Sequence, residues 1–103
     1  MESNLLDAVK KLAQKSYQDL FSYAGFVNMM ECFAEQHAEF NKENREKFQC
    51  IWTELEVLNA CALDEWELKG RKRDFEFEWD TKYKEEAKKL VERILKFINE
   101  VLK

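Results

Sequence analysis

The chain has 103 residues and a net charge of −4, with 37% charged and 14% aromatic residues. This length accommodates one hydrophobic core, so we expect a single domain over 1–103, and the aromatic content argues against disorder. The negative charge disfavours direct binding to nucleic acid, and no apolar run is long enough to cross a membrane.

The cysteines and the first residues indicate a compartment. Three cysteines form an odd set without the Cys-x-x-Cys spacing of metal or redox motifs, which is typical of free thiols in a reducing environment. No positively charged stretch precedes an apolar run at the N-terminus. We therefore expect a soluble, unexported, cytoplasmic protein.

Apolar residues recur at helical spacing along almost the whole chain. Proline is absent, and Gly25 and Gly70 are the two glycines. Because every residue can donate its backbone N–H to a helical hydrogen bond, the sequence predicts an all-α fold.

The first predicted element covers residues 4–40. One apolar face runs past Gly25 without a change of phase, and a second row, Phe26, Met29, Phe33 and Phe40, lies beside it. Since a single glycine weakens a helix by only about 1 kcal/mol, the pattern fits one long helix kinked at Gly25 or two helices that meet there.

The second predicted helix covers residues 42–69. A polar break at 41–44 precedes it, and Asn41 or Asn44 can serve as its N-cap. Lys69 in the last turn and Gly70 just beyond are typical of a helix C-terminus. The basic run over 69–73 is surrounded by acids and is interpreted as a solvated turn.

The third predicted helix covers residues 74–102, with Asp74 as a candidate N-cap. Residues 75–79 also alternate with period two, so an extended start is the alternative to a continuous helix. The two long helices joined by a short link must form an antiparallel hairpin. The predicted fold is therefore an antiparallel up-down bundle of three long helices, or four if the chain turns at Gly25.

No pattern of catalytic or metal-binding residues is present. The Glu-x-x-His spacing of di-iron bundles would require an acid three residues before His37, where Ala34 stands. Neither glycine belongs to a phosphate-binding loop. We expect no enzymatic activity, no metal and no cofactor.

Two features exceed what an isolated bundle needs. The first is an apolar row on the second helix, opposite its main stripe: Cys50, Val57, Cys61 and Leu68. A helix that is apolar on two sides either is central in its bundle or contacts another chain, in which case the row could form a seam between identical chains. The second is an acidic and aromatic surface that could contact a partner protein: Asp64, Glu67, Glu76, Phe77, Glu78, Trp79 and Asp80. The alternative is that the rings at this end of the hairpin pack against the N-terminal helix. Phe77 does not share the helix face of Phe75 and Trp79, so it is difficult to bury.

These features favour a small acidic module that binds another protein, and the negative charge indicates that this partner is basic. Immunity proteins, antitoxins and phage-encoded inhibitors do this kind of task by occupying a partner's surface, and the comparison is one of type only. The alternative is a structural or assembly protein, in which the Cys50 to Leu68 row makes a homodimer or larger helical assembly. No contact with a membrane is expected.

Overall fold

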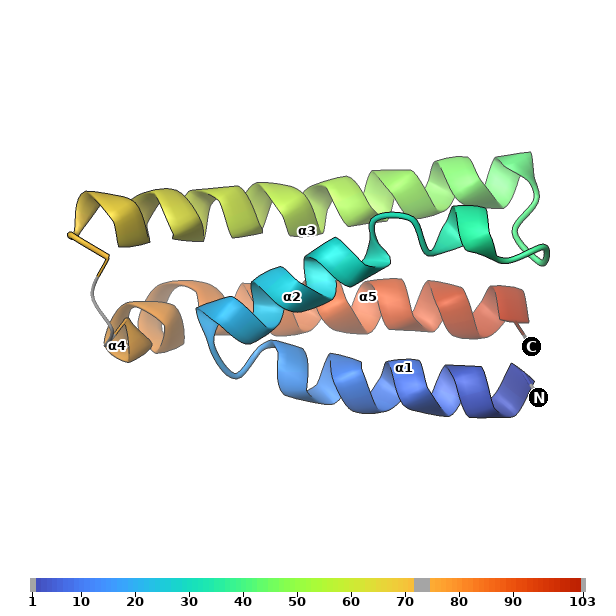
Figure 1. Cartoon of the computed structure of the whole chain (residues 1–103), viewed down its shortest axis with the longest axis horizontal. Helices are drawn as coiled ribbons and strands as arrows, with labels where there is room; N and C mark the ends of the chain where they lie inside the picture. The colour runs from blue at the N-terminus through green and yellow to red at the C-terminus, as the bar shows by residue number, and fades with distance from the viewer. Residues whose placement is uncertain (1, 72–74, 103) are drawn as a thin grey trace.

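In the computed structural model, which describes residues 2–71 and 75–102, every element is helical. Four main helices run alternately up and down: α1 (Glu2–Ser16), α2 (Leu20–Met30), α3 (Lys42–Leu68) and α5 (Lys84–Leu102). Three short elements complete the fold: the 3-10 turn η1 (Ala34–Gln36), helix α4 (Glu76–Glu78) and the π-helix η2 (Trp79–Tyr83). The predicted all-α antiparallel bundle is confirmed (Figure 1).

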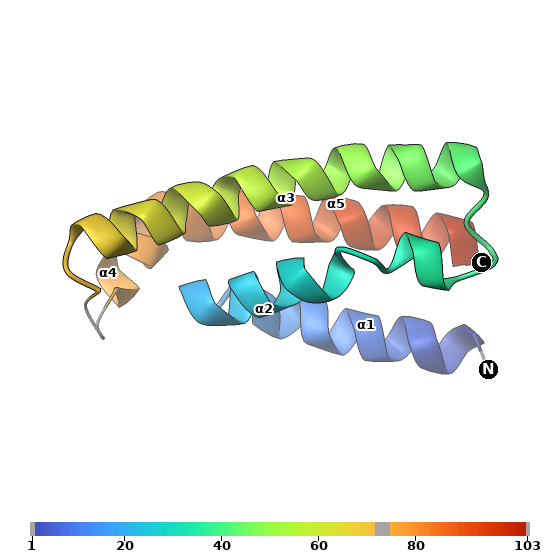
Figure 2. The same ribbon diagram turned by 45° about the horizontal axis from the view of Figure 1, so that its top comes forward.

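The four main helices form a ring of neighbours. Helix α5 packs against α1 and α3, and α2 packs against the same two helices. Figure 2 shows α3 beside α5 and α2 beside α1. Helix α1 begins and α5 ends at the same end of the bundle, whereas α4 lies at the other end (Figure 1).

The predicted position of the first turn was wrong. The chain turns at residues 17–19, not at Gly25, which lies inside α2. The Ser16 hydroxyl donates to the carbonyl of Ala13 (2.7 Å) at the end of α1, and Asp19 caps α2 by accepting the N–H of Ser22 (2.8 Å). Because the turn has three residues, Ser16 and Leu20 keep a spacing of four, so the apolar pattern passes through it unchanged.

Helix α3 begins and ends as its sequence predicts. The side chain of Asn41 accepts the N–H of Asn44 (2.8 Å). At the other end Gly70 has φ of 85°, and the N–H of Arg71 donates to the carbonyl of Trp66 (2.9 Å). This hydrogen bond, from an N–H to the carbonyl five residues earlier, is the one that defines a Schellman motif. The motif needs a residue in the left-handed conformation, which glycine adopts at the lowest energetic cost.

The last stretch is helical from Glu76 onward, so the extended alternative for residues 75–79 is excluded. The predicted cap Asp74 lies outside the described residues. The N–H of Lys84 donates to the carbonyl of Trp79, five residues earlier, which makes η2 one wide turn between α4 and α5.

The core lies between the four main helices, with α5 contributing Ala87, Leu90, Val91, Ile94, Ile98 and Leu102. Phe33, Phe40 and Phe48 are buried together near the start of α3, with ring centroids 5.7–6.0 Å apart. Met29, which the periodicity assigned to the second apolar row, lies at the surface instead and is 46% exposed; Leu12 of α1 is 44% exposed.

Candidate functional site

The predicted acidic and aromatic surface lies where α3 ends and α4 begins. Asp64 and Glu67 are exposed on α3, and Glu76 and Asp80 are exposed on α4 and η2. Glu78, the last residue of α4, is half-buried and accepts a hydrogen bond from Nζ of Lys69 at the end of α3. Helix packing therefore brings residues 64–67 and 76–80 to one end of the bundle.

The two large rings of this segment have opposite environments. Trp79 is 1% exposed, and its Nε1 donates to the carbonyl of Tyr17 (2.9 Å) in the α1–α2 turn. Trp79 is thus a core residue and does not lie on the predicted contact surface. Phe77, two residues earlier, is 63% exposed. The buried rings of Phe75 and Trp79 fix α4 on the core and leave Phe77 pointing outward, because residues two apart on a helix face different directions.

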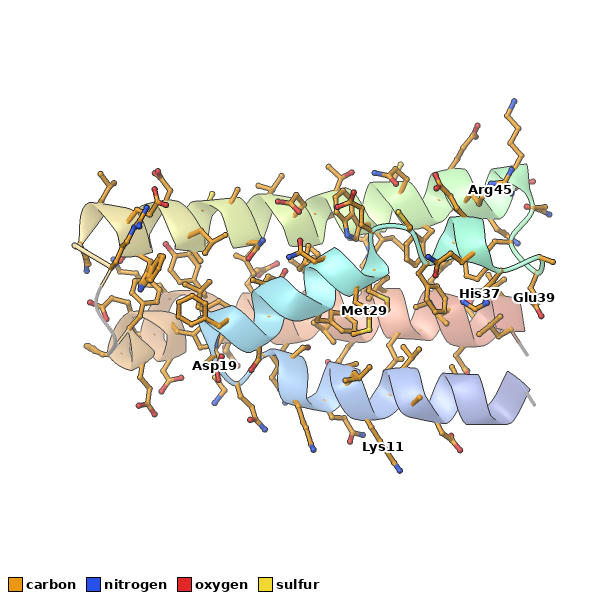
Figure 3. All side chains as sticks on the ribbon, in the orientation of Figure 1. Lys11, Asp19, Met29, His37, Glu39 and Arg45 are labelled. Atoms are coloured by element: carbon orange, nitrogen blue, oxygen red, sulfur yellow. The ribbon has the colours of Figure 1, made fainter. Side chains whose placement is uncertain are left out.

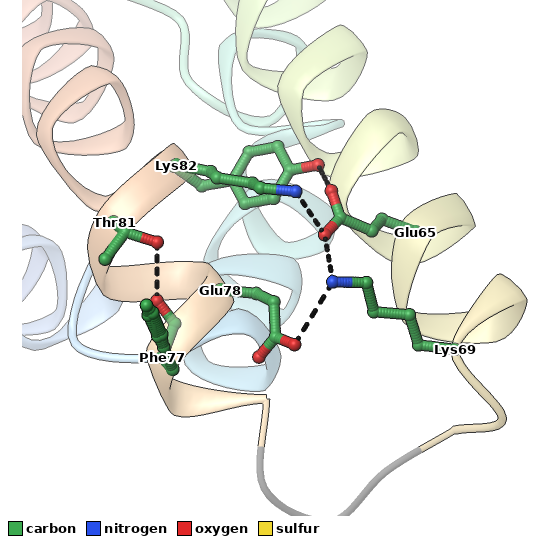
Figure 4. Close-up of polar contacts among 7 residues, drawn as sticks. Glu65, Lys69, Phe77, Glu78, Thr81 and Lys82 are labelled. Atoms are coloured by element: carbon green, nitrogen blue, oxygen red, sulfur yellow. Dashed lines mark hydrogen bonds and ion pairs between the residues drawn. The ribbon is translucent and has the colours of Figure 1, made fainter.

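A polar cluster holds α4 and η2 against α3 (Figure 4). Nζ of Lys69 lies 3.2 Å from carboxylate oxygens of both Glu65 and Glu78, and Nζ of Lys82 lies 2.9 Å from Glu65. The Tyr83 hydroxyl donates to Glu65 Oε1 (2.6 Å). The carboxylates of Glu65 and Glu78 are therefore used in contacts that connect α3 with α4 and η2.

The pKa values in this cluster follow from its hydrogen bonds. The hydroxyl of Tyr83, followed by the ammonium of Lys82, lowers the pKa of Glu65 to about 2. Burial and the bond to Glu65 raise the pKa of Tyr83 to about 12. Hydrogen bonds to Glu65 and Glu78 raise the pKa of Lys69. Glu65 is thus held in its charged form.

The surroundings of the cluster remain negative. Residues 64–71 and 75–84 contain six carboxylates and four cations. Outside the cluster, Arg71 pairs with Glu67 (3.3 Å) and Lys84 with Asp80 (3.9 Å), both at the solvent-exposed surface where such pairs are weak. The described residues of these two ranges therefore carry a net charge of −2.

A cavity of about 730 Å³ lies beside this surface, between the α1–α2 turn and α4. Its walls include the rings of Phe21 and Phe75 and the carboxyl-bearing residues Asp19 and Glu76. Sequence reasoning did not place Asp19 or Phe21 here, because the turn at residues 17–19 was not recognised. Acidic side chains next to aromatic rings suit the side chain of a lysine or arginine.

The predicted seam on α3 is exposed along its length. Cys50 and Cys61 are exposed thiols, Val57 is 57% exposed and Leu68 is 80% exposed. The row therefore lies outside the core, on the side of α3 that no other described element covers.

A further exposed apolar surface was missed by the sequence analysis. A groove of about 340 Å³ between α1 and α2 is lined by Leu12, Lys15, Ser16, Phe21, Ser22, Gly25, Phe26 and Met29. Met29 lies near the middle of this side of the bundle in Figure 3. The signal in the sequence is that residues 20–30 contain no charged residue, although the chain is 37% charged.

The single histidine has an aromatic neighbour. The ring centroids of His37 and Phe33 are 4.4 Å apart, and His37 lies at the end of the bundle that also carries Glu39 and Arg45 (Figure 3). Within residues 2–71 and 75–102, no group of three histidine, cysteine or acidic side chains is placed to hold a metal ion, and no helix has the length and apolar character needed to span a bilayer.

The function of this protein has to be inferred from the surfaces described above, because comparison with known proteins found no match. No protein-family model, no curated protein and no solved structure matches this chain.

Proposed function

We propose that this protein is a binding module that inhibits or neutralises a basic partner protein by occupying its surface, as immunity proteins, antitoxins and phage-encoded inhibitors do. The observations that carry the proposal are the cavity lined by Asp19, Phe21, Phe75 and Glu76 and the exposed ring of Phe77, which follows Glu76 in the same short helix. Aromatic anchors beside a pocket are typical of the residues that dominate binding energy at protein interfaces.

The geometry supports a preformed contact. Phe77 extends from a short helix that is fixed on both sides by buried rings, and the Thr81 hydroxyl donates to the Phe77 carbonyl (2.7 Å; Figure 4). A backbone held in this way loses little conformational freedom on binding. The net negative charge of the same end would attract a basic partner and increase the rate of association.

The alternative is a homo-oligomer formed through the α3 row, which is exposed as that function requires. Its charge pattern is unfavourable, however. In an antiparallel seam, residues at equal distances before and after the midpoint of the contact face each other. A seam centred on position 59 pairs Val57 with Cys61 of the second copy, and it also pairs Glu54 with Asp64. Two such contacts would bring carboxylates together, and like charges across an interface are destabilising. The ion pair of Glu54 with Arg93 of its own chain (2.6 Å) offsets part of this repulsion.

The proposal is tested by affinity capture from the source cells with wild-type and variant baits. We expect Phe77→Ala to lose a partner that the wild type retains, while the matched surface variant Val57→Ala retains it. Both side chains are mostly exposed, so each variant should unfold within about 0.5 kcal/mol of the wild type. Capture of the same partners by the Phe77→Ala bait would refute the proposed surface.

The electrostatic part of the proposal has its own measurement. Once the partner is purified, Glu76→Gln combined with Asp80→Asn should lower the association rate and weaken its dependence on salt. Glu78 is left unchanged, because it bonds Lys69 inside the protein. Glu43→Gln combined with Glu46→Gln on exposed α3 positions far from the cavity is the control and should change the rate little.

A further inference from the structure

The cavity between the α1–α2 turn and α4 has an apolar floor and an acidic rim. Phe75 is 4% exposed and Trp79 is 1% exposed, so the rings of these residues belong to the floor. Asp19 and Glu76 are exposed at the rim, one in the turn and the other on α4, and no lysine or arginine of the described residues lines the cavity. A side chain with an apolar stem and a positive end suits this arrangement, because its stem contacts rings while its end reaches carboxylates.

The walls of the cavity are fixed by hydrogen bonds within the chain. Nε1 of Trp79 donates to the carbonyl of Tyr17 (2.9 Å), which joins η2 to the α1–α2 turn. Oδ1 of Asp19 accepts the N–H of Ser22 (2.8 Å), and this bond holds the carboxylate at the edge of the turn. Figure 3 shows Asp19 there, at the end of the bundle that carries α4 in Figure 1. The volume of about 730 Å³ is within the range of sites that bind small ligands.

The aromatic residues at this end of the bundle already accommodate one guanidinium group. The guanidinium carbon of Arg71 lies 5.9 Å from the ring centroid of Trp66, and Nη2 of Arg71 pairs with Glu67 (3.3 Å). The ring of Trp66 also contacts Phe21 edge-on, with the centroids 5.1 Å apart. Phe21 lines the cavity together with Asp19, so the cavity repeats the combination of ring and carboxylate that Arg71 contacts.

We propose that the cavity binds the side chain of an arginine of the basic partner protein, an inference that rests on the proposed function for the nature of that partner. The guanidinium group donates to the carboxylate of Asp19 and lies against the ring of Phe21, and Glu76 adds negative charge on the α4 side. Arginine is favoured over lysine, because a planar guanidinium stacks on rings and reaches two acceptors at once, whereas an ammonium group is a strongly hydrated point charge.

A nuclear magnetic resonance titration of the isotope-labelled full chain with acetyl-arginine methylamide tests the site without the partner. We expect this compound to shift the backbone amide signals of Phe21, Ser22 and Glu76. The matched citrulline compound has the shape of arginine without its charge, and it should bind about tenfold more weakly, because the charged hydrogen bonds are lost. The matched lysine compound should bind with an intermediate affinity.

The sign of the charge is tested with acetyl-glutamate methylamide. The N-terminus of α2 lies at the same turn, and a helix N-terminus by itself favours an anion. Tighter binding of the glutamate compound at these signals would overturn the proposal. Equal affinities for the arginine and citrulline compounds, or no shift with the arginine compound, would also overturn it.

Asp19→Asn separates the charge of the site from the stability of the fold. Asparagine caps a helix about as well as aspartate does, so the melting temperature should stay near that of the wild type. The affinity for the arginine compound should fall about tenfold, because the guanidinium loses a charged acceptor. Asp7→Asn makes the same change at an exposed position near the start of α1, at the other end of the bundle, and should leave the affinity unchanged. An unchanged affinity in Asp19→Asn would contradict the proposed site.

The arginine site and the proposed function fail in different ways. If the arginine compound binds and the Phe77→Ala bait captures the same partners as the wild type, the proposed function is refuted and the arginine site stands. If Phe77→Ala loses the partner and the arginine compound does not bind, the arginine site is refuted and the proposed function stands.

Discussion

Three aromatic side chains donate hydrogen bonds from the interior to backbone carbonyls of other elements. Tyr23 bonds Leu55 (2.9 Å), Trp52 bonds Val27 (2.8 Å) and Trp79 bonds Tyr17 (2.9 Å). Each ring is buried or half-buried, and its polar atom is satisfied without water. These bonds connect α2 to α3 and connect η2 to the α1–α2 turn.

At the residue scale, Trp79 and Phe77 should respond differently to substitution. Trp79→Phe removes the donor to the Tyr17 carbonyl and part of a buried ring, so we expect a loss of about 1–3 kcal/mol in the free energy of unfolding. Phe77→Leu changes a mostly exposed side chain and should alter the free energy of unfolding by less than about 0.5 kcal/mol. Urea denaturation measures both. Equal losses would mean that the two rings are not divided between core and surface.

Glu65 predicts a specific dependence of stability on pH. Its pKa falls from 4.5 to about 2 on folding, so the unfolded chain binds the proton more readily than the folded chain does. The stabilisation is complete above pH 4.5 and is lost as the pH falls towards 2. Glu65→Gln should therefore lower the melting temperature at pH 7 and give a flatter decline over that interval.

Glu43→Gln is the control for the pH measurement. Glu43 forms an exposed pair with Lys47 on α3 (3.1 Å), and such pairs contribute little. Its melting curve against pH should run parallel to that of the wild type. If the Glu65→Gln curve were also parallel, the cluster around Glu65 would not be the source of acid sensitivity.

At the scale of single elements, the two glycines predict opposite changes. Gly70→Ala places a Cβ on a residue with φ of 85°, so it strains the C-terminus of α3 and should lower the free energy of unfolding by about 1–2 kcal/mol. Gly25→Ala fills open space inside α2 and should stabilise the monomer by about 0.5–1 kcal/mol. Chemical denaturation of dilute protein measures both, and changes of the same sign would contradict the assignment of the two backbone conformations.

At the scale of the whole molecule, we expect the bundle to unfold as one unit. Each main helix packs against two others in a closed ring, so removal of any one exposes core residues of its neighbours. Circular dichroism and tryptophan fluorescence should therefore give the same urea midpoint. Separate midpoints would show that the bundle does not unfold as one unit.

Much of the architecture could be predicted from periodicity and helix ends. Asn41 and Gly70 marked the ends of α3 correctly, because capping depends on local hydrogen bonds and backbone conformation. The turn at residues 17–19 was missed, since it preserves the apolar spacing. Exposure of Phe77 was predicted from its position on the helix, whereas burial of Trp79 and the cavity beside Asp19 depend on where the α1–α2 turn meets α4.

The sequence by itself determined the helical class and the antiparallel hairpin of α3 and α5, because these follow from the spacing of apolar residues and the shortness of the link between the two helices. Only the tertiary structure decided which apolar residues are covered. Met29 and Phe26 belong to one row in the sequence, yet Phe26 is 2% exposed and Met29 is 46% exposed. The physical reason is that burial depends on the neighbouring helices, and periodicity along one helix does not say how many neighbours it has.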